Sequence, residues 1–191
     1  MAGMVTFPRL FGRTTVLPAE HATLTLPGTQ RIHLREGRAS DCELVKRMFY
    51  RLSPTTIYHR LFVPAPQTPD WAARFAELTM ATNVPGSVSK AALQAGEIVG
   101  ICNFVPSATT AHEAEMAIVV EDAWQGKGLG RALLSGLVIE ARRLDITVFT
   151  ATILGDNSRA LRFVTRFFPQ IEVHLIDREY EVRATLTMGE V

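Results

Sequence analysis

A glycine-rich stretch in the last third of the chain constrains the fold more than any other feature. In QGKGLGR, residues 125–131, a glycine occupies every second position. The apolar run 116–120 precedes this stretch, and a helical pattern of apolar residues over 129–143 follows it. A strand, a glycine turn and a helix place unpaired backbone N–H groups at the positive end of a helix, where glycine lets an anion approach closely. The stretch therefore predicts an anion site, most naturally for a phosphate.

Composition limits the class of molecule that could carry this phosphate. The 191 residues are 47% apolar and 20% charged, as in soluble globular proteins. A net charge of +1 gives no overall field that would attract nucleic acid or an anionic membrane, so neither is expected as a partner. Cys42 and Cys102 are expected to be free thiols, and neither has a second ligand at metal-binding spacing. No apolar run resembles a membrane span or a signal peptide, so a cytoplasmic protein without a metal is expected.

The periodicity predicts one folded domain at 31–191, preceded by a partly ordered arm at 1–30 that is rich in Pro and Gly. The expected order is a strand at 31–35, helices near 41–52, 54–61 and 70–78, a hairpin of 88–93 with 98–105, a strand at 113–120, a helix at 129–143, a strand at 147–154, a helix at 157–167, and strands at 172–176 and 181–187. A single helix connects 113–120 to 147–154, which predicts that these two strands are parallel. The fold class is therefore α/β, as an α+β mixed sheet: an antiparallel meander followed by a parallel strand pair, flanked by helices.

Helix starts are predicted from capping residues. Ser40 or Asp41 is expected to cap the first helix, and Asp70 the third. Ser53 suits the N-cap of the second helix because Pro54 follows at the first helical position.

Two nucleotide motifs do not fit the glycine stretch. A dinucleotide site requires G-x-G-x-x-G, but Arg131 stands at the third glycine position. A mononucleotide P-loop requires Ser or Thr after Gly-Lys, but Gly128 follows Lys127.

The stretch instead resembles the acetyl-CoA signature of the GNAT family of N-acetyltransferases, R/Q-x-x-G-x-G/A. Gln125, Gly128 and Gly130 occupy its three defined positions, and the element order from about 31 to 187 is similar to the GNAT fold. The resemblance implies an N-acetyltransferase that uses acetyl-CoA as co-substrate and acetylates a primary amine by direct attack. A tight turn without a ligand is the simpler explanation of the glycines alone.

The resemblance also implies which residues bind acetyl-CoA. In the family, the pyrophosphate rests on N–H groups of the glycine turn, the pantetheine arm pairs with the preceding strand, and an Asn after the next strand contacts the arm. The residues implied here are Ile118, Val119, Val120, Gln125, Gly126, Lys127, Gly128, Leu129, Gly130, Arg131 and Asn157. Solvated cations explain Lys127 and Arg131 equally well, and an N-cap role explains Asn157.

Amine acetylation needs a neutral amine, so a base must take a proton from the charged form. Glu115 stands where many GNAT enzymes carry a basic Glu, and Glu113 on the same strand face is the alternative. Because Ala114 and Met116 flank Glu115, we expect it to be partly desolvated. A solvated strand face explains both carboxylates without any chemistry.

The chain departs from the family at the usual general acid, a Tyr seven residues after the Asn. That position is Val164. Tyr50, Tyr58 and Tyr180 are unanchored alternatives.

Residues 51–62, RLSPTTIYHRLF, resemble a segment of Pat-type protein lysine acetyltransferases, R-L-S-P-x-S-x-Y-x-R-F-F, which also lack that Tyr. This favours a protein lysine as acceptor. A capped helix start explains the same Ser-Pro pair. A small-molecule amine acceptor and a non-catalytic acyl-CoA-sensing module stay open as alternatives, and so does the oligomeric state, with a homodimer as one option.

Overall fold

A mixed sheet of eight strands forms the centre of the molecule in the computed structural model, which describes residues 4–6, 16–18, 21–26, 30–80 and 84–186. The order across the sheet is β3 (His21–Leu26), β4 (Gln30–Glu36), β5 (Val88–Gln94), β6 (Glu97–Pro106), β7 (Glu113–Val120), β8 (Val148–Leu154), β10 (Glu179–Thr185) and β9 (Ile171–Ile176). Among the described strands, β7 and β8 form the one parallel pair. The predicted fold class, including the meander and the parallel pair, is confirmed. A separate short pair joins β1 (Met4–Thr6) to β2 (Val16–Pro18).

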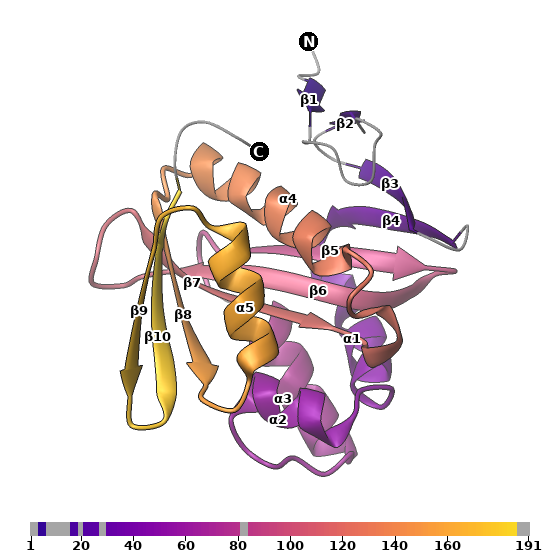
Figure 1. The fold of residues 1–191 in the computed structure, drawn as a ribbon. Coiled ribbons are helices and arrows are strands. Elements are labelled where there is room, and N and C mark those ends of the chain that lie inside the picture. The colour runs from indigo at the N-terminus through magenta and orange to yellow at the C-terminus, as the bar shows by residue number, and fades with distance from the viewer. Residues whose placement is uncertain (1–3, 7–15, 19–20, 27–29, 81–83, 187–191) are drawn as a thin grey trace.

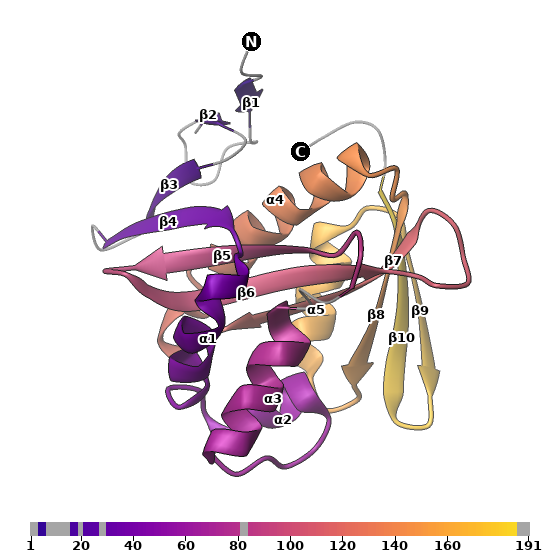
Figure 2. The same cartoon turned by 180° about the vertical axis from the view of Figure 1, so that it is seen from behind.

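Helices cover both faces of the sheet (Figures 1 and 2). On one face lie α4 (Leu129–Arg143) and α5 (Ser158–Phe167), and on the other lie α1 (Cys42–Phe49), α2 (Pro54–Leu61) and α3 (Pro69–Met80). Short 3₁₀ turns precede α1 at η1 (Ala39–Asp41) and follow β7 at η2 (Asp122–Trp124). Each layer has its own buried core, one around Phe104 and Phe149, the other around Phe49 and Phe75. Strand alternation explains this division, because successive β6 residues, Ile101 and Cys102, enter opposite cores.

The predicted hairpin turn and the predicted Ser53 cap are both confirmed. At the tip of the β5–β6 hairpin, Ala95 and Gly96 both have positive φ, 49° and 85°, as a type I′ turn requires. Ser53 caps α2 as expected: its side chain accepts the Thr56 N–H at 3.2 Å.

Asp41 is the N-cap residue of α1, as one of the two predicted candidates, but its side chain makes no cap bond, and the predicted cap at Asp70 is wrong. The Asp41 carboxylate instead accepts bonds from the Arg35 guanidinium, at 2.6 and 2.7 Å, and the Arg38 N–H, at 2.8 Å. Asp70 lies inside the first turn of α3, because that helix already begins at Pro69.

The amino-terminal strand β3 lies in the stretch that the sequence assigned to an arm. It pairs along its whole length with β4, and so adds a strand to the edge of the sheet. Much of residues 1–30, and position 187 at the end of the last predicted strand, lie outside the described residues. A division of the chain at residue 30 therefore stays a prediction.

Candidate active site

A cavity opens where the two parallel strands separate. The β7–β8 ladder holds for three residue pairs, Glu113 with Val148, Ala114 with Phe149 and Glu115 with Thr150. Both strands continue beyond that point without pairing to each other, β7 to Val120 and β8 to Leu154. The resulting cavity of about 700 Å³ is lined by α2, the end of β7, the glycine turn, the β8–α5 loop and α5. Main-chain groups at the end of β7 are therefore available to a ligand on the side that faces β8.

The structure brings most of the predicted cofactor residues together around this cavity. Those that line it are Ile118, Val119, Val120, Gln125, Gly126, Gly128, Gly130, Arg131 and Asn157. Two others point elsewhere. The Leu129 side chain is buried in the core, and the Lys127 ammonium lies over the Trp124 ring, 5.2 Å from its centroid.

The glycine turn has the backbone conformation that only glycine adopts easily. Gly126 and Gly128 have φ of 74° and 89°. A Cβ at Gly126 would also lie 3.2 Å from the Arg159 Nη2. Because Gly128 begins α4 without a side-chain cap, the first N–H groups of the helix have no acceptor within it. The turn thus fits the role of an anion cradle.

Two predicted ligand side chains also have structural partners. The Gln125 Nε2 donates to the Val120 carbonyl at 2.9 Å, and its Oε1 accepts a bond from Arg159 at 2.7 Å. The Asn157 Oδ1 accepts the Ala160 N–H at 3.1 Å and so caps α5. The N-cap explanation of Asn157 is confirmed, while its contact with a ligand stays a prediction.

The two candidate bases have different surroundings. The Glu113 carboxylate forms an ion pair with Arg183, and the bond from that guanidinium holds the pKa of Glu113 below its ordinary value. Glu115 stands at the last paired position before β7 and β8 separate. Its side chain is exposed and makes no hydrogen bond to the described residues, so the expected desolvation is wrong. Since Arg183 pairs with Glu113, Glu115 is the carboxylate of the two that has no ion-pair or hydrogen-bond partner among the described residues.

Comparison with known proteins decides the family. The model of the acetyltransferase (GNAT) family matches residues 50–168. This chain belongs to the GNAT family. That family uses acetyl-CoA, which is the cofactor that the sequence predicts.

Individual GNAT relatives agree with this assignment. The chain is 26% identical over 134 residues to acetyltransferase Pat of Mycolicibacterium smegmatis, an overlap of 70% of this chain and 40% of that protein. It is similar in structure to the GNAT domain of S. lividans PAT, with a TM-score of 0.74 and 23% identity over 86% of this chain and 96% of that domain. Another neighbour is the yncA protein of Salmonella typhimurium with its cofactor acetyl-CoA (TM-score 0.62, 20% identity, 84% and 96% coverage).

The chain spans only part of its curated relatives. Its matches cover 40% of Pat and 40% of the L-methionine sulfoximine/L-methionine sulfone acetyltransferase of Salmonella typhimurium, to which it is 41% identical over 69 residues. The family and the fold are established by the family match and the structural similarity.

Five described arginines line the GNAT cavity and give it its charge, four from α4 and α5 and Arg60 from α2. Arg131, Arg159, Arg162 and Arg166 line it from α4 and α5. The two acids in the lining have other partners: Asp122 bonds Ser53 and Thr56, and Asp156 bonds His59 at 3.1 Å. This cationic wall fits the phosphates of coenzyme A. Within the described residues, no cluster of His, Cys, Asp and Glu is arranged to hold a metal ion.

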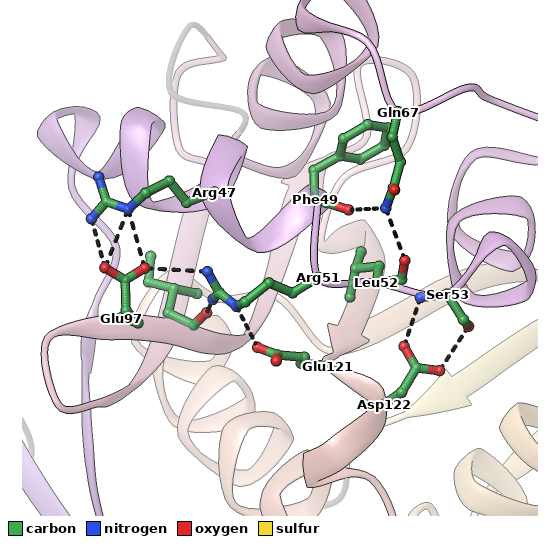
Figure 3. Close-up of polar contacts among 10 residues, drawn as sticks. Arg47, Phe49, Arg51, Leu52, Ser53, Gln67, Glu97, Glu121 and Asp122 are labelled. Carbon is green, nitrogen blue, oxygen red and sulfur yellow. Dashed lines mark hydrogen bonds and ion pairs between the residues drawn. The ribbon is translucent and has the colours of Figure 1, made fainter.

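The first half of the Pat-like segment is structural (Figure 3). Arg51 bonds Glu97 at 3.2 Å, Glu121 at 3.1 Å and the Ile98 carbonyl at 2.6 Å, which fixes the α1–α2 connection to the sheet. Ser53 bonds Asp122 just before the glycine turn. These contacts hold the start of α2 against the cofactor cavity.

The second half of that segment contains a residue that the sequence did not single out. Arg60 lines the cavity from α2, and its Nε is buried without a hydrogen-bond partner among the described residues. Burial lowers the pKa of Arg60 to about 10, against the opposing effect of the Glu115 charge. Its place in the Pat-like segment, seven residues after Ser53, was the available signal.

No tyrosine replaces the usual general acid. Val164 is buried, 3% exposed, and belongs to the core beneath α5. The lining of the cavity includes none of Tyr50, Tyr58 and Tyr180.

No described helix is long and apolar enough to cross a bilayer.

Proposed function

We propose that this chain transfers the acetyl group of acetyl-CoA to a primary amine by direct attack, and that the acceptor is a lysine side chain of a protein. Membership of the GNAT family supports the transfer, and so does the cationic cavity, which opens just beyond the last β7–β8 pair at Glu115, although Glu115 itself is not among its lining residues. The similarity to Pat supports the lysine.

Each element of the cavity has a role in this proposal. The N–H groups of residues 125–131 and the neighbouring arginines hold the phosphates, while main-chain groups of Ile118–Val120 and the Asn157 side chain hold the arm. Bound acetyl-CoA supplies an activated acyl carbonyl. An N–H at the end of β7 polarises that carbonyl in the manner of an oxyanion hole.

Glu115 is the base in this proposal. It takes the proton of the acceptor ammonium directly or through a water molecule, so that a neutral amine attacks. Glu113 is the weaker candidate because Arg183 already holds its carboxylate.

The openness of the sheet face around Glu115 is the observation that favours a protein acceptor. Direct register places Glu115, Thr150, Arg183 and Glu172 side by side across β7, β8, β10 and β9. Glu115, Arg183 and Glu172 are exposed, and none of the described helices covers β8, β10 and β9 on this face of the sheet (Figure 2). A small-molecule site usually encloses its ligand, whereas this open face admits a side chain projecting from another protein.

Charge on the same face suits a lysine. The side chains that share it by strand register carry more negative than positive charge; they include Glu113, Glu115, Glu172, Glu181, Arg183 and His174. Acidic groups attract an ammonium before its proton is removed.

The alternative of an acyl-CoA sensor rests on Val164, which leaves the usual tyrosine acid without a replacement in the cavity lining. Thiolate is a good leaving group, so the absence of a tyrosine does not prevent transfer.

A panel of acceptors tests the proposal. Purified protein would be incubated with acetyl-CoA and either lysine-containing proteins, polyamines or amino acids, and both free thiol release and product mass would be measured. We expect acetyl-lysine on proteins and slower reaction of the small amines. A preparation that binds CoA yet releases no thiol with any acceptor would support the sensor instead.

A further inference from the structure

One face of α5 carries more positive charge than a pyrophosphate requires. Arg159, Arg162 and Arg166 lie at helical spacing i, i+3 and i+7, and all three line the cavity. Residues so spaced share one side of a helix. Arg131 joins them from α4, with its guanidinium 5.4 Å from the centroid of the Phe167 ring. We call Arg159, Arg162 and Arg166 the α5 arginine face.

This arrangement is unfavourable for α5 unless an anion is bound. The first turn of the helix has no acidic residue, although the positive end of a helix favours acids there. Instead Arg159 occupies that turn, and Arg162 follows one turn later. In the described lining no free carboxylate balances them, since Asp156 bonds His59 and Asp122 bonds Ser53. The charge therefore indicates an anionic ligand alongside α5.

The α5 arginine face is long enough to contact two phosphate groups. Arg159 is fixed beside the glycine turn by its bond to Gln125. With a rise of 1.5 Å per residue, Arg166 lies about 10 Å further along α5. A pyrophosphate seated on the glycine turn carries roughly two negative charges, and a phosphate monoester adds about 1.5 to 2 more. Arg131 of the glycine turn lies against Phe167, so α5 runs alongside the whole turn, and its arginine face carries more cations than the first phosphate group needs.

We propose that Arg162 and Arg166 bind the 3′-phosphate of coenzyme A and make the cavity selective for the 3′-phosphorylated cofactor. This inference rests on the proposed function only in taking coenzyme A as the ligand. Exposed guanidinium groups bind a phosphate monoester by charge-assisted hydrogen bonds, which are stronger than neutral ones.

Calorimetric titration of the full chain with CoA and with 3′-dephospho-CoA, at one fixed salt concentration, tests the proposal. We expect the wild-type protein to bind CoA roughly ten- to a hundred-fold more tightly, because hydrogen bonds between charged groups contribute on this scale. In the double variant Arg162→Gln and Arg166→Gln, the two ligands should bind with nearly equal Kd. The Kd for dephospho-CoA should change by no more than about twofold.

Arg143→Gln is the matched control. Arg143 lies in the last turn of α4, where it bonds Glu140, and it does not line the cavity. This variant should keep the wild-type preference for CoA.

The outcomes are distinguishable. Equal wild-type affinity for the two ligands, or an equal loss of both in the double variant, would overturn the 3′-phosphate assignment while leaving acetyl transfer intact. A wild-type protein that binds neither ligand would overturn this assignment and the proposed function together.

Discussion

The Asp122 carboxylate joins Ser53 at the start of α2 to the turn that holds the proposed cofactor. Its Oδ2 accepts the Ser53 backbone N–H at 2.9 Å, and its Oδ1 accepts the Ser53 hydroxyl at 2.8 Å (Figure 3). The same hydroxyl oxygen accepts the Thr56 N–H and caps the helix. One serine thus fixes α2 internally and attaches it to the element that follows β7.

We therefore expect Ser53→Ala and Asp122→Ala to be coupled. Each variant should lower the free energy of unfolding by about 1–2 kcal/mol, through loss of the cap or of its acceptor. Because the two groups bond each other, the double variant should lose less than the sum, with an interaction energy of about 0.5–3 kcal/mol. Urea unfolding of all four proteins measures this. Strictly additive losses would show that the contact contributes nothing to stability.

The two glutamates of β7 should differ in activity. Glu115→Gln removes the proposed base and should reduce kcat by about 10²- to 10⁴-fold with little change in CoA affinity. Glu113→Gln is the matched control on the same strand face, and it should keep most of the rate because its carboxylate already binds Arg183. Steady-state kinetics together with CoA titration separate the two effects. Equal kcat values in the two variants would show that Glu115 is not the base.

Replacement of Arg60 should stabilise the protein while impairing its function. The buried Nε of Arg60 has no described partner, so Arg60→Met removes an unsatisfied buried donor. An unsatisfied buried donor costs about 1–3 kcal/mol, so its removal should raise the free energy of unfolding by up to that amount. We expect a higher melting temperature without ligand and a lower rate of acetyl transfer, since the cavity loses a cation. Arg60→Lys keeps the charge and should not raise the melting temperature; a melting temperature that falls in Arg60→Met would contradict the argument.

Two glycines of the β7–α4 region should respond in opposite ways to alanine. Gly128 has a φ of 89°, so Gly128→Ala should cost about 1–2 kcal/mol and weaken CoA binding by distorting the turn. Gly136 lies inside α4, and a Cβ there would meet only the Lys90 Cγ, at 3.9 Å. Gly136→Ala should therefore stabilise the helix by about 0.5–1 kcal/mol. Thermal unfolding and CoA titration of both variants check the pair.

Acidification should lower the free energy of unfolding by the contribution that the ionised Asp41 carboxylate makes. Burial alone would raise the pKa of Asp41, but the bonds from Arg35 and the Arg38 N–H outweigh it and hold the pKa below the ordinary 3.8. The unfolded chain then binds the proton more tightly, so this contribution is complete above pH 3.8 and is lost as the pH falls through the lower folded value. Asp41→Asn should be clearly less stable than wild type at pH 7, and the difference should narrow at pH 3.

Unfolding by urea at the two pH values measures that difference. Glu43→Gln, the same kind of change at an exposed position that bonds Lys46, serves as the control and should differ little in stability from wild type at pH 7. A gap for Asp41→Asn that does not narrow in acid would refute the assignment.

Local patterns accounted for most elements of the fold. Alternation placed β7 at 113–120, and the positive-φ turn of Ala95 and Gly96 lies where the Gln-Ala-Gly-Glu sequence predicted a bend. The single helix between β7 and β8 predicted their parallel pairing. These features depend on residues close in sequence, so the sequence can specify them. The side-chain cap at Asp41 and the cap at Asp70 failed because Arg35 competed for one carboxylate and Pro69 began the other helix early.

The sequence by itself determined the element order, the glycine turn and hence the family. Backbone conformation at glycine and the spacing of apolar side chains are local properties, and they leave a readable signal. Only the tertiary structure decided which charged side chains have ion-pair or hydrogen-bond partners. It placed Arg183 on Glu113, 70 residues away, left the Arg60 Nε buried without a hydrogen-bond partner among the described residues, and gathered the α5 arginine face beside the glycine turn. Ion pairing and burial depend on contacts between distant segments, so no local pattern encodes them.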